Sequence, residues 1–365
     1  MPIAAVPRFH VFGSSTPTPP SERTLYVDGS AGSAYRPEVD LELSHWVPTT
    51  TPARWAADTS TEICLRFLAD PPADVDAYDL AVNNHVDVDG ILSVFCLVQP
   101  ELAQAQRDVV IGAAEMGDLA AWADWPSFRL AQELTLHMGG FGAPGRDPLD
   151  TYAAAFDLIP SVLADAHPAP ASVVAGWEGL AAQAEALDGD GPVRVTEHGP
   201  RLVAYALPEL DDHARAAALL VPPFNTVIDE AAWLWPHARN RRHGQALHLV
   251  SVPADGGWLH DLWLPGYVWA HTPDRWRPPM LENLGTSNTW RIHPEPLAGI
   301  VAALQTDEQR PGTWVVAESI DPFAAVPGRS FPVIVSFLDD GNRPTPSAHP
   351  PHEVAERLAP ALAEA

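Results

Sequence analysis

The sequence predicts an α/β protein in two parts: a first domain with a largely parallel sheet flanked by helices, and a second, smaller α+β domain. Three observations support this. The apolar run 80–84 has the length of a buried strand, and the apolar segment 91–98 after it suits a helix packed on a sheet. Apolar residues over 101–163 recur with a helical period. Beyond the turn at 188–191 the pattern changes to short β-forming runs separated by turns.

The domain boundaries follow from length and composition. A chain of 365 residues is long enough for two domains, and the proline- and alanine-rich stretch 167–172 is the predicted linker. We predict an irregular N-terminal arm rich in Pro, Ser and Thr, an α/β domain that carries a metal site, an α+β domain for substrate binding, and a C-terminal helix. These segments are, in order, 1–25, 26–167, 173–345 and 346–365.

Individual elements are predicted from local periodicity. In the first domain the expected strands are 39–43, 62–68 and 80–84, and the expected helices are 91–98, 101–121, 127–138 and 151–163. The second domain is expected to contain strands 193–196, 202–207, 246–252, 258–263, 314–318 and 333–337, with helices 173–187, 211–220, 296–305 and 349–365.

The charge of the chain limits its partners. The formal net charge is −26, and all 21 basic residues are arginines. Such acidity opposes binding to a long nucleic acid and leaves a small anionic molecule, held by local arginines, as the expected partner. We expect no membrane span and no secretory signal, and hence a cytoplasmic protein. Cys64 and Cys96 both lie in apolar runs and are expected to be buried thiols.

The segment 81–93 is the strongest functional signal. It reads Ala-Val-Asn-Asn-His-Val-Asp-Val-Asp-Gly-Ile-Leu-Ser, a strand end followed by an acidic turn and a helix. Alternate positions place the imidazole of His85 and the carboxylates of Asp87 and Asp89 on one side of an extended segment. Nitrogen and oxygen ligands of this kind suit Mn²⁺ first, with Fe²⁺, Zn²⁺ or Mg²⁺ as alternatives. Gly90 permits the turn, and the helix start at Ile91 offers N–H groups to an anion such as phosphate.

This segment resembles the first motif of the DHH phosphoesterase superfamily, His-x-Asp-x-Asp-Gly followed by a helix with an early serine. His85, Asp87, Asp89, Gly90 and Ser93 match it. The resemblance implies phosphoester hydrolysis, with Ser93 near the substrate and with two Mn²⁺ ions bridged by an aspartate of a second motif.

The remaining family motifs are matched less well. Asp118 is the candidate for the second-motif aspartate, with Glu115 on the same helical face in reserve. The third motif, paired histidines after an aspartate, is not found, and the nearest string is Asp211-Asp212-His213. His45, which follows a predicted strand, and Asp58, which begins the hydroxyl-rich run 58–61, are therefore further candidate ligands.

Substrate contacts are expected from the second domain. Arg239, Arg241 and Arg242 form the dense basic cluster of this acidic chain, and guanidinium groups suit phosphate or carboxylate. Gly256 and Gly257 form a glycine turn, and the accessory domain of DHH proteins often offers such a turn to the substrate.

The sequence thus predicts a metal-dependent hydrolase, with His85, Asp87 and Asp89 as its catalytic centre and a small anionic phosphoester as substrate. Two alternatives stay open. One is a metalloenzyme on the same scaffold that acts on a carboxylate or amide metabolite. The other is a non-catalytic binding protein with a degenerate site.

Overall fold

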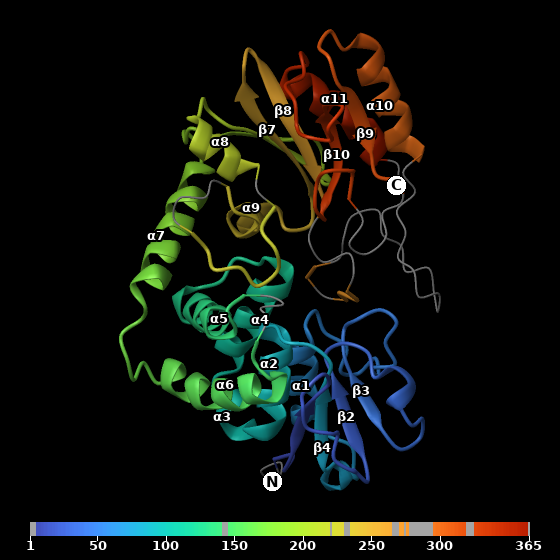
Figure 1. The fold of residues 1–365 in the computed structure, drawn as a ribbon, viewed down its shortest axis with the longest axis vertical. Helices are drawn as coiled ribbons and strands as arrows, with labels where there is room; N and C mark the ends of the chain where they lie inside the picture. The colour runs from blue at the N-terminus through green and yellow to red at the C-terminus, as the bar shows by residue number, and fades with distance from the viewer. Residues whose placement is uncertain are drawn as a thin grey trace. The chain divides into compact units, whose positions relative to one another are not determined.

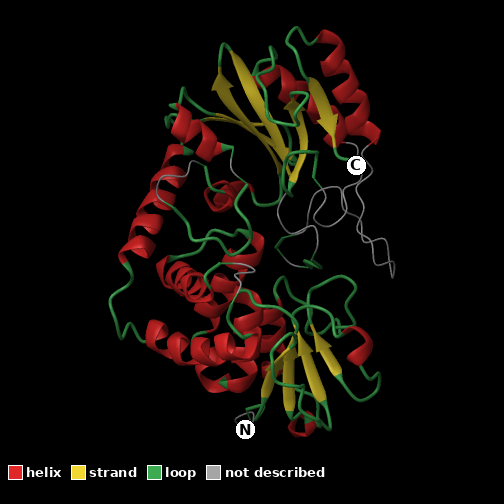
Figure 2. Ribbon diagram, in the orientation of Figure 1, coloured by secondary structure: helices red, strands yellow, loops and turns green. Residues whose placement is uncertain are grey.

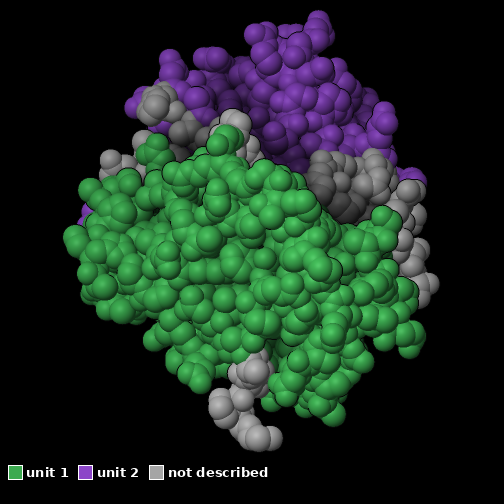
Figure 3. Space-filling view, turned by 60° about the horizontal axis from the view of Figure 1, so that its bottom comes forward, with its two compact units in different colours: residues 1–177, 223–229, 270–275 green, residues 178–222, 230–269, 276–365 purple. Residues whose placement is uncertain are grey.

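The computed structural model describes residues 5–140, 145–219, 221–229, 234–264, 270–273, 275–276, 295–318 and 325–363. The chain divides into two compact units, coloured separately in Figure 3. Unit 1 comprises Met1–Trp177, Pro223–Asp229 and Ala270–Arg275, and unit 2 comprises Glu178–Pro222, Glu230–Trp269 and Trp276–Ala365. The division lies close to the predicted linker, but two short segments that we had assigned to the second domain belong to unit 1.

Unit 1 has the predicted α/β architecture, with a four-stranded sheet and flanking helices (Figures 1 and 2). Its strands are β1 (Phe9–Val11), β2 (Thr24–Val27), β3 (Leu41–Leu43) and β4 (Leu80–Asn83). They are ordered β1-β4-β2-β3, and every pairing is parallel. All four residues of β4 are buried, which explains why this strand reads as a continuous apolar run.

The N-terminal arm is a correction. We expected an irregular segment through residue 25, but β1 and the start of β2 lie within it. Each strand has only three or four residues, too few to show a period of two. Both pair with β4, from Phe9 with Ala81 and from Thr24 with Leu80, so their strand character depends on a partner more than 50 residues away in the chain.

The helices of unit 1 pack against this sheet and against one another (Figure 1). Helix α2 contacts β4 and β2, α1 contacts β3, and α6 contacts β1. The bounds are α1 Ser60–Ala69, α2 Val88–Val98, α3 Pro100–Ala105, α4 Arg107–Leu119, α5 Trp125–Met138, α6 Pro148–Leu163 and α7 Ala171–Ala186, with short 3₁₀ turns at Gly32–Ala34 and Val75–Ala77. The last of these helices, α7, crosses the division between the two units.

The predicted strand 62–68 is wrong, because this segment lies in α1. The Thr59 side chain accepts a hydrogen bond from the backbone N–H of Glu62, which is one of the two hydrogen bonds of a capping box. Glu62 also pairs with Arg66 one turn later. The run has too few polar residues to reveal its helical period, so the cap is the local signal that identifies the helix.

Unit 2 contains a six-stranded mixed sheet in the order β5-β6-β7-β8-β10-β9, in which only β6 and β7 pair in parallel. All the strands predicted for the second domain are confirmed to within two residues: β5 Arg194–Glu197, β6 Leu202–Ala206, β7 Leu247–Ala254, β8 Gly257–Trp263, β9 Thr313–Val316 and β10 Val333–Leu338. Its further helices are α8 Asp212–Ala218, α9 Pro236–His243, α10 Glu295–Asp307 and α11 Pro351–Ala363.

The sequence analysis also made predictions about the two cysteines and about membrane-spanning helices. Cys64 in α1 and Cys96 in α2 are both buried, unpaired thiols, as predicted. Within the described part of the chain, no helix combines the length and the apolar character that a membrane span requires.

Candidate metal centre

Three parallel strands of unit 1 deliver polar residues to one edge of the sheet. Asp28 directly follows β2, His45 lies two residues after β3, and the segment from His85 to Asp89 follows β4. Parallel strands point the same way, so their carboxyl ends meet. Asp118 reaches the same place from the last turn of α4.

The first cluster consists of Asp28, His45, Asp89 and Asp118, all of them buried. His45 Nε2 lies 3.5 Å from an oxygen of Asp28, 3.5 Å from an oxygen of Asp89 and 3.4 Å from an oxygen of Asp118. One potential ligand atom from each residue lies within 4.8 Å of the others. Three carboxylates therefore surround a single imidazole nitrogen.

The second cluster consists of Asp28, His85 and Asp87. His85 Nε2 lies 3.1 Å from Oδ2 of Asp28 and 2.9 Å from Oδ2 of Asp87. Asp28 therefore belongs to both clusters: its Oδ1 faces His45, and its Oδ2 faces His85. Its backbone has a φ of 47°, a left-handed conformation that non-glycine residues seldom adopt and that is often found at functional sites.

Backbone contacts fix the directions of His45 and Asp89. The ring of His45 donates from Nδ1 to the carbonyl oxygen of Asp58 at 2.7 Å, which leaves Nε2 to face the aspartates. The carboxylate of Asp89 accepts hydrogen bonds from the N–H groups of Ser60 and Thr61 at 2.8 and 2.9 Å. These N–H groups belong to the first turn of α1, where a negative charge is favoured.

The electrostatics are those of crowded, buried acids. Burial, followed by the nearby Asp28, raises the pKa of Asp89 to about 6. Burial and the charge of Asp87 raise the pKa of Asp118 well above its ordinary value. For His45 burial acts to lower the pKa, but Asp118, Asp28 and Asp89 outweigh it and raise that pKa. Without a metal, the cluster retains protons to balance its charge.

The pKa of Asp28 moves the other way. Burial acts to raise it, but His85 and His45 lie on either side of the carboxylate and together lower this pKa. Asp28 is therefore the carboxylate most firmly held as an anion between the two histidines.

These residues fit a divalent metal ion. Oδ2 of Asp28 and Oδ2 of Asp118 are buried, and neither accepts a hydrogen bond from any residue that the structure describes. A buried carboxylate oxygen without a donor is costly unless a cation balances it. Imidazole nitrogens with several carboxylate oxygens form a donor set that Mn²⁺, Fe²⁺ and Zn²⁺ accept.

One family model matches residues 7–217, more than half of the chain, and it describes DUF6687, a family of unknown function. The protein belongs to the DUF6687 family. No match was found among curated proteins or among solved structures. Every residue of both clusters lies inside the DUF6687 region. The resemblance to DHH phosphoesterases therefore stays a prediction from the motif around His85.

The structure brings together five of the predicted site residues and adds one. His85, Asp87, Asp89, Asp118 and His45 all belong to the two clusters. The residue that it adds is Asp28, which the sequence analysis does not identify. The local signal was the string Leu-Tyr-Val-Asp-Gly at 25–29, a short apolar run ending in an acid. The string spans the predicted boundary between the irregular arm and the α/β domain, where no strand is predicted.

Three predictions for unit 1 need correction. Asp58 belongs to neither cluster: its carbonyl oxygen orients His45, and its carboxylate accepts the N–H of Arg275 at 2.6 Å. Ser93 is fully buried, with its hydroxyl 3.4 Å from that of Thr61 between α1 and α2, so it supports helix packing. The residue shared by the two clusters is Asp28, whereas the resemblance had implied that Asp118 bridges two ions.

The helix start also differs from the prediction. Helix α2 begins at Val88, so Gly90 lies in its first turn and not in a preceding loop. The N–H of Gly90 is bound by Oδ1 of Asp87 at 2.7 Å, and the N–H of Ile91 by the Asp87 carbonyl at 3.1 Å. Asp87 thus caps the helix with its own oxygens, and these N–H groups are already satisfied.

The predicted substrate residues of unit 2 belong to neither cluster. Arg239 is buried, stacks over the ring of Trp263 at 4.3 Å and lies 3.1 Å from Nδ1 of His248. Burial lowers the pKa of Arg239 to about 10. It is part of the core of unit 2, so the prediction of a substrate contact is wrong for this residue.

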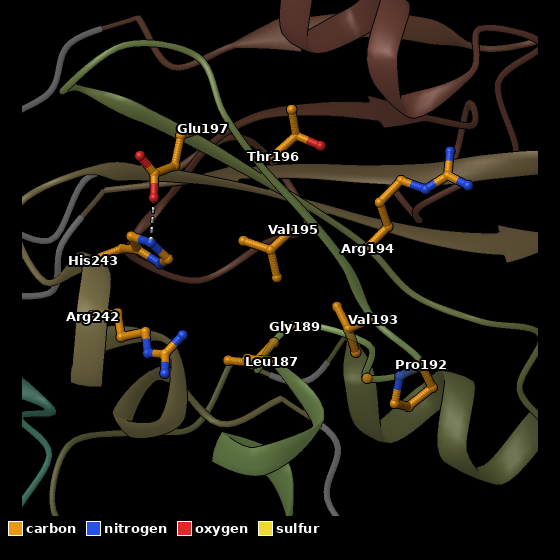
Figure 4. Close-up of a pocket in the computed structure, with 11 residues that line it drawn as sticks. Leu187, Gly189, Pro192, Val193, Arg194, Val195, Thr196, Glu197, Arg242 and His243 are labelled. Carbon is orange, nitrogen blue, oxygen red and sulfur yellow. Dashed lines mark hydrogen bonds and ion pairs between the residues drawn. The ribbon is translucent and has the colours of Figure 1, made fainter.

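The other two arginines are exposed on α9. Arg242 pairs with Asp188 at 2.8 Å and lines a pocket of about 730 Å³ along β5, together with Arg194, Glu197 and His243 (Figure 4). In that pocket His243 Nε2 lies 3.3 Å from Glu197. Arg241 has no place in the lining of the pocket.

The glycine turn at 256–257 is a β-hairpin turn. Asp255 and Gly256 both have positive φ, which a tight turn between β7 and β8 requires. A Cβ on Gly257 would lie 2.4 Å from the carbonyl oxygen of Ser347. These glycines are explained by the hairpin and by its packing, so the prediction of a substrate contact is not supported.

Gly90 is expected to be required for the shape of the centre. A Cβ at this position would lie 2.5 Å from Asn83 Nδ2, 2.7 Å from the Tyr152 hydroxyl and 2.9 Å from Asp87 Oδ1. Gly90→Ala should lower the free energy of unfolding by about 1–3 kcal/mol, as overpacking does. The matched control is Gly299→Ala in α10, where a Cβ meets nothing within 4 Å. It should raise stability by about 0.5–1 kcal/mol. Chemical denaturation measures both, and equal effects would contradict the close approach at Gly90.

Metal-free protein should lose stability as pH rises from about 4 to about 7. The pKa values of Asp89 and Asp118 are raised in the folded state, so the unfolded chain loses these protons first and folding is favoured at the lower pH. His45 and His85, whose pKa values are also raised, act in the same direction. The lowered pKa of Asp28 affects only more acidic conditions.

Urea denaturation of chelator-treated protein across this pH range measures the free energy of unfolding at each pH. We expect its total decrease to be on the order of 1–3 kcal/mol. Asp118→Asn removes one of the raised carboxyls and should make the fall shallower, while the exposed Asp340→Asn should leave it unchanged. A rise in stability over this range would show that the cluster does not retain protons.

Proposed function

We propose that this protein is a metal-dependent hydrolase that cleaves a phosphoester bond in a small anionic molecule. The observation that carries the proposal is the position of Asp28, whose two oxygens face two separate clusters of metal-ligand side chains. Two divalent ions bridged by one carboxylate are a common arrangement in phosphoester hydrolysis, where they act on the attacking and the leaving oxygens. The DHH-like motif at His85, Asp87 and Asp89 supports the same chemistry.

In this proposal Asp28, His45, Asp89 and Asp118 would hold one ion, and Asp28, His85 and Asp87 would hold the other. Mn²⁺ is the expected ion, because the donor set mixes imidazole with carboxylates. When bound, the ions supply Lewis-acid activation of water and of the scissile group. The protein supplies fixed ligand directions: α1 holds Asp89 in place, and the Asp58 carbonyl sets the tautomer of His45.

Substrate should approach from the side of His85. Its side chain is 21% exposed, whereas the side chains of Asp28, His45 and Asp89 are fully buried. The ring of Trp46 stands edge-on to His85 at 5.5 Å and donates from Nε1 to Oδ1 of Asp28 at 3.0 Å. Trp46 therefore forms one wall beside the most accessible ligand and also orients the shared carboxylate.

Metal content provides the direct test. Purified protein reconstituted with Mn²⁺ should bind about two ions per chain. His85→Gln should lose the second ion and Asp118→Asn the first, so each should retain about one, whereas Asp28→Asn should retain none. The control Asp340→Asn changes an exposed aspartate of unit 2 and should bind as the wild type does. Elemental analysis gives the counts, and circular dichroism confirms that each variant is folded. A wild-type protein that binds no metal after reconstitution would refute the proposal.

Turnover of activated esters tests the chemistry. Mn²⁺-loaded wild type should release nitrophenol from nitrophenyl phosphate mono- or diesters. His85→Gln should reduce kcat by at least about 100-fold, since changes outside the ligand shell already cost about 10–100-fold. Asp340→Asn should keep full activity. If metal-loaded protein leaves phosphoesters intact but hydrolyses nitroanilides or carboxylate esters, the alternative of a metalloenzyme acting on an amide or carboxylate replaces this proposal.

A further inference from the structure

Unit 2 contains a cavity of about 340 Å³ beside β5, an edge strand of its sheet. The cavity lies between β5, β6 and the start of α11, which packs against β6. Most of its lining is apolar, and the polar part consists of Arg194, Thr196, His198 and His352. All the lining residues belong to unit 2. A cavity of this volume is large enough for a small molecule.

Small side chains on β6 leave this space. Ala204 and Ala206 line the cavity, and each pairs with another lining residue of β5, Ala204 with Thr196 and Ala206 with Arg194. Residues that pair across two strands point to the same face of a sheet. Two methyl groups fill little of the gap between this face and the start of α11 at Pro351. The hollow is therefore a consequence of the sequence of β6.

Strand β5 directs its basic and acidic side chains to opposite faces of the sheet. Arg194, Thr196 and His198 occupy alternate positions and line this cavity. Glu197 lies between two of them and lines the neighbouring pocket drawn in Figure 4, where it contacts His243. In that view the side chain of Arg194 extends away from that of Glu197. Alternate residues of a strand point to opposite faces, so the Glu197 carboxylate is kept away from the cavity.

The cavity is basic although the protein is strongly acidic. Arg194, His198 and His352 line it, and none of the described residues in its lining is an aspartate or a glutamate. The chain as a whole has 47 acidic residues and 21 arginines. A hollow lined by basic groups alone is therefore complementary in charge to an anion.

These basic side chains are not neutralised by the protein itself. Within the part of the chain that the structure describes, the side chains of Arg194 and His352 make no hydrogen bond or ion pair. Nε2 of His198 is buried, and it too has no hydrogen-bond partner among the described residues. In the neighbouring pocket, by contrast, Arg242 pairs with Asp188 at 2.8 Å. A buried polar nitrogen lowers stability unless a ligand or water satisfies it.

We infer that this cavity is a second ligand site, which binds a small carboxylate with an apolar body. The guanidinium of Arg194 offers the planar pair of donors that suits a carboxylate. Helix α11 begins at Pro351 in the lining, and the N-terminal end of a helix favours negative charge. Trp258 and the prolines and alanines of the lining provide apolar contacts for the rest of the ligand. The site is formed by unit 2 alone, so the inference does not depend on the proposed function.

Probe molecules that separate charge from apolar contact test the inference. Benzoate, phenylacetate and phenylpropionate have both features, whereas acetate lacks the apolar body and benzyl alcohol lacks the charge. Calorimetry on the full-length protein, with a chelator present so that metal ions do not bind the probes, gives affinity and stoichiometry. At least one of the three aromatic carboxylates should bind at one molecule per chain with a Kd below about 1 mM. Acetate and benzyl alcohol should bind at least about 10-fold more weakly.

Two pairs of variants locate the binding site. Arg194→Gln should weaken carboxylate binding by at least about 10-fold, and Arg194→Lys should recover part of the loss. The control Arg343→Gln changes an arginine of unit 2 that is 81% exposed, and it should bind as the wild type does. Ala206→Leu fills the cavity and should abolish binding, whereas Ala302→Leu places the same side chain at an exposed position of α10 and should not. Circular dichroism confirms that each variant is folded.

Several results would overturn the inference. Failure of all three aromatic carboxylates to bind at concentrations up to about 10 mM would refute the site. Equal affinity for benzyl alcohol would show an apolar crevice that does not recognise charge. Unchanged affinity in both Arg194→Gln and Ala206→Leu would place the ligand elsewhere. Binding of inorganic phosphate but of no carboxylate, lost in Arg194→Gln, would refute the carboxylate as the ligand class. None of these results bears on the metal centre.

Discussion

The buried carboxylate of Asp28 is the constraint on which the candidate site depends. It lies between two imidazoles, it receives hydrogen bonds from Trp46 and Ser60 on one oxygen, and its other oxygen faces His85. The parallel pairing of β2 with β4 brings it there, since each strand ends at the same edge. If that pairing were shifted, the two clusters would have no common member.

The surroundings of Asp28 offset the cost of burying charge. An isolated buried carboxylate is strongly unfavourable, and several in one place repel one another. The N-terminus of α1 stabilises Asp89 through two backbone N–H groups, and the histidines balance part of the remaining charge. The pKa shifts of Asp89 and Asp118 indicate that this balance is incomplete without a cation. In the function that we propose, a divalent ion balances this charge, and its binding would release protons.

Two segments beyond residue 217, Pro223–Asp229 and Ala270–Arg275, belong to unit 1 together with the candidate metal centre. The family match ends before the segments that carry Asn225 and Arg275, yet both contact residues adjacent to the ligands or to their supports. The sequence-based search for an anion contact chose the densest group of arginines, on α9. Density was misleading there, because Arg239 is held in the core of unit 2 by Trp263 and His248.

The sequence by itself determined the α/β class, the strands of the second domain and the strand–helix motif that holds His85, Asp87 and Asp89. These follow from patterns within about 20 residues: apolar runs, periodicity and turn residues. The tertiary structure decided the rest. The strands β1 and β2 depend on pairing with distant β4, so Asp28 could not be recognised as a neighbour of His85 from local signals. Asp58 and Ser93 have residue types that suit a site, but their side chains contact Arg275 and Thr61 and belong to neither cluster. Whether a polar residue serves chemistry or packing depends on what surrounds it in space, and a single sequence records only what surrounds it along the chain.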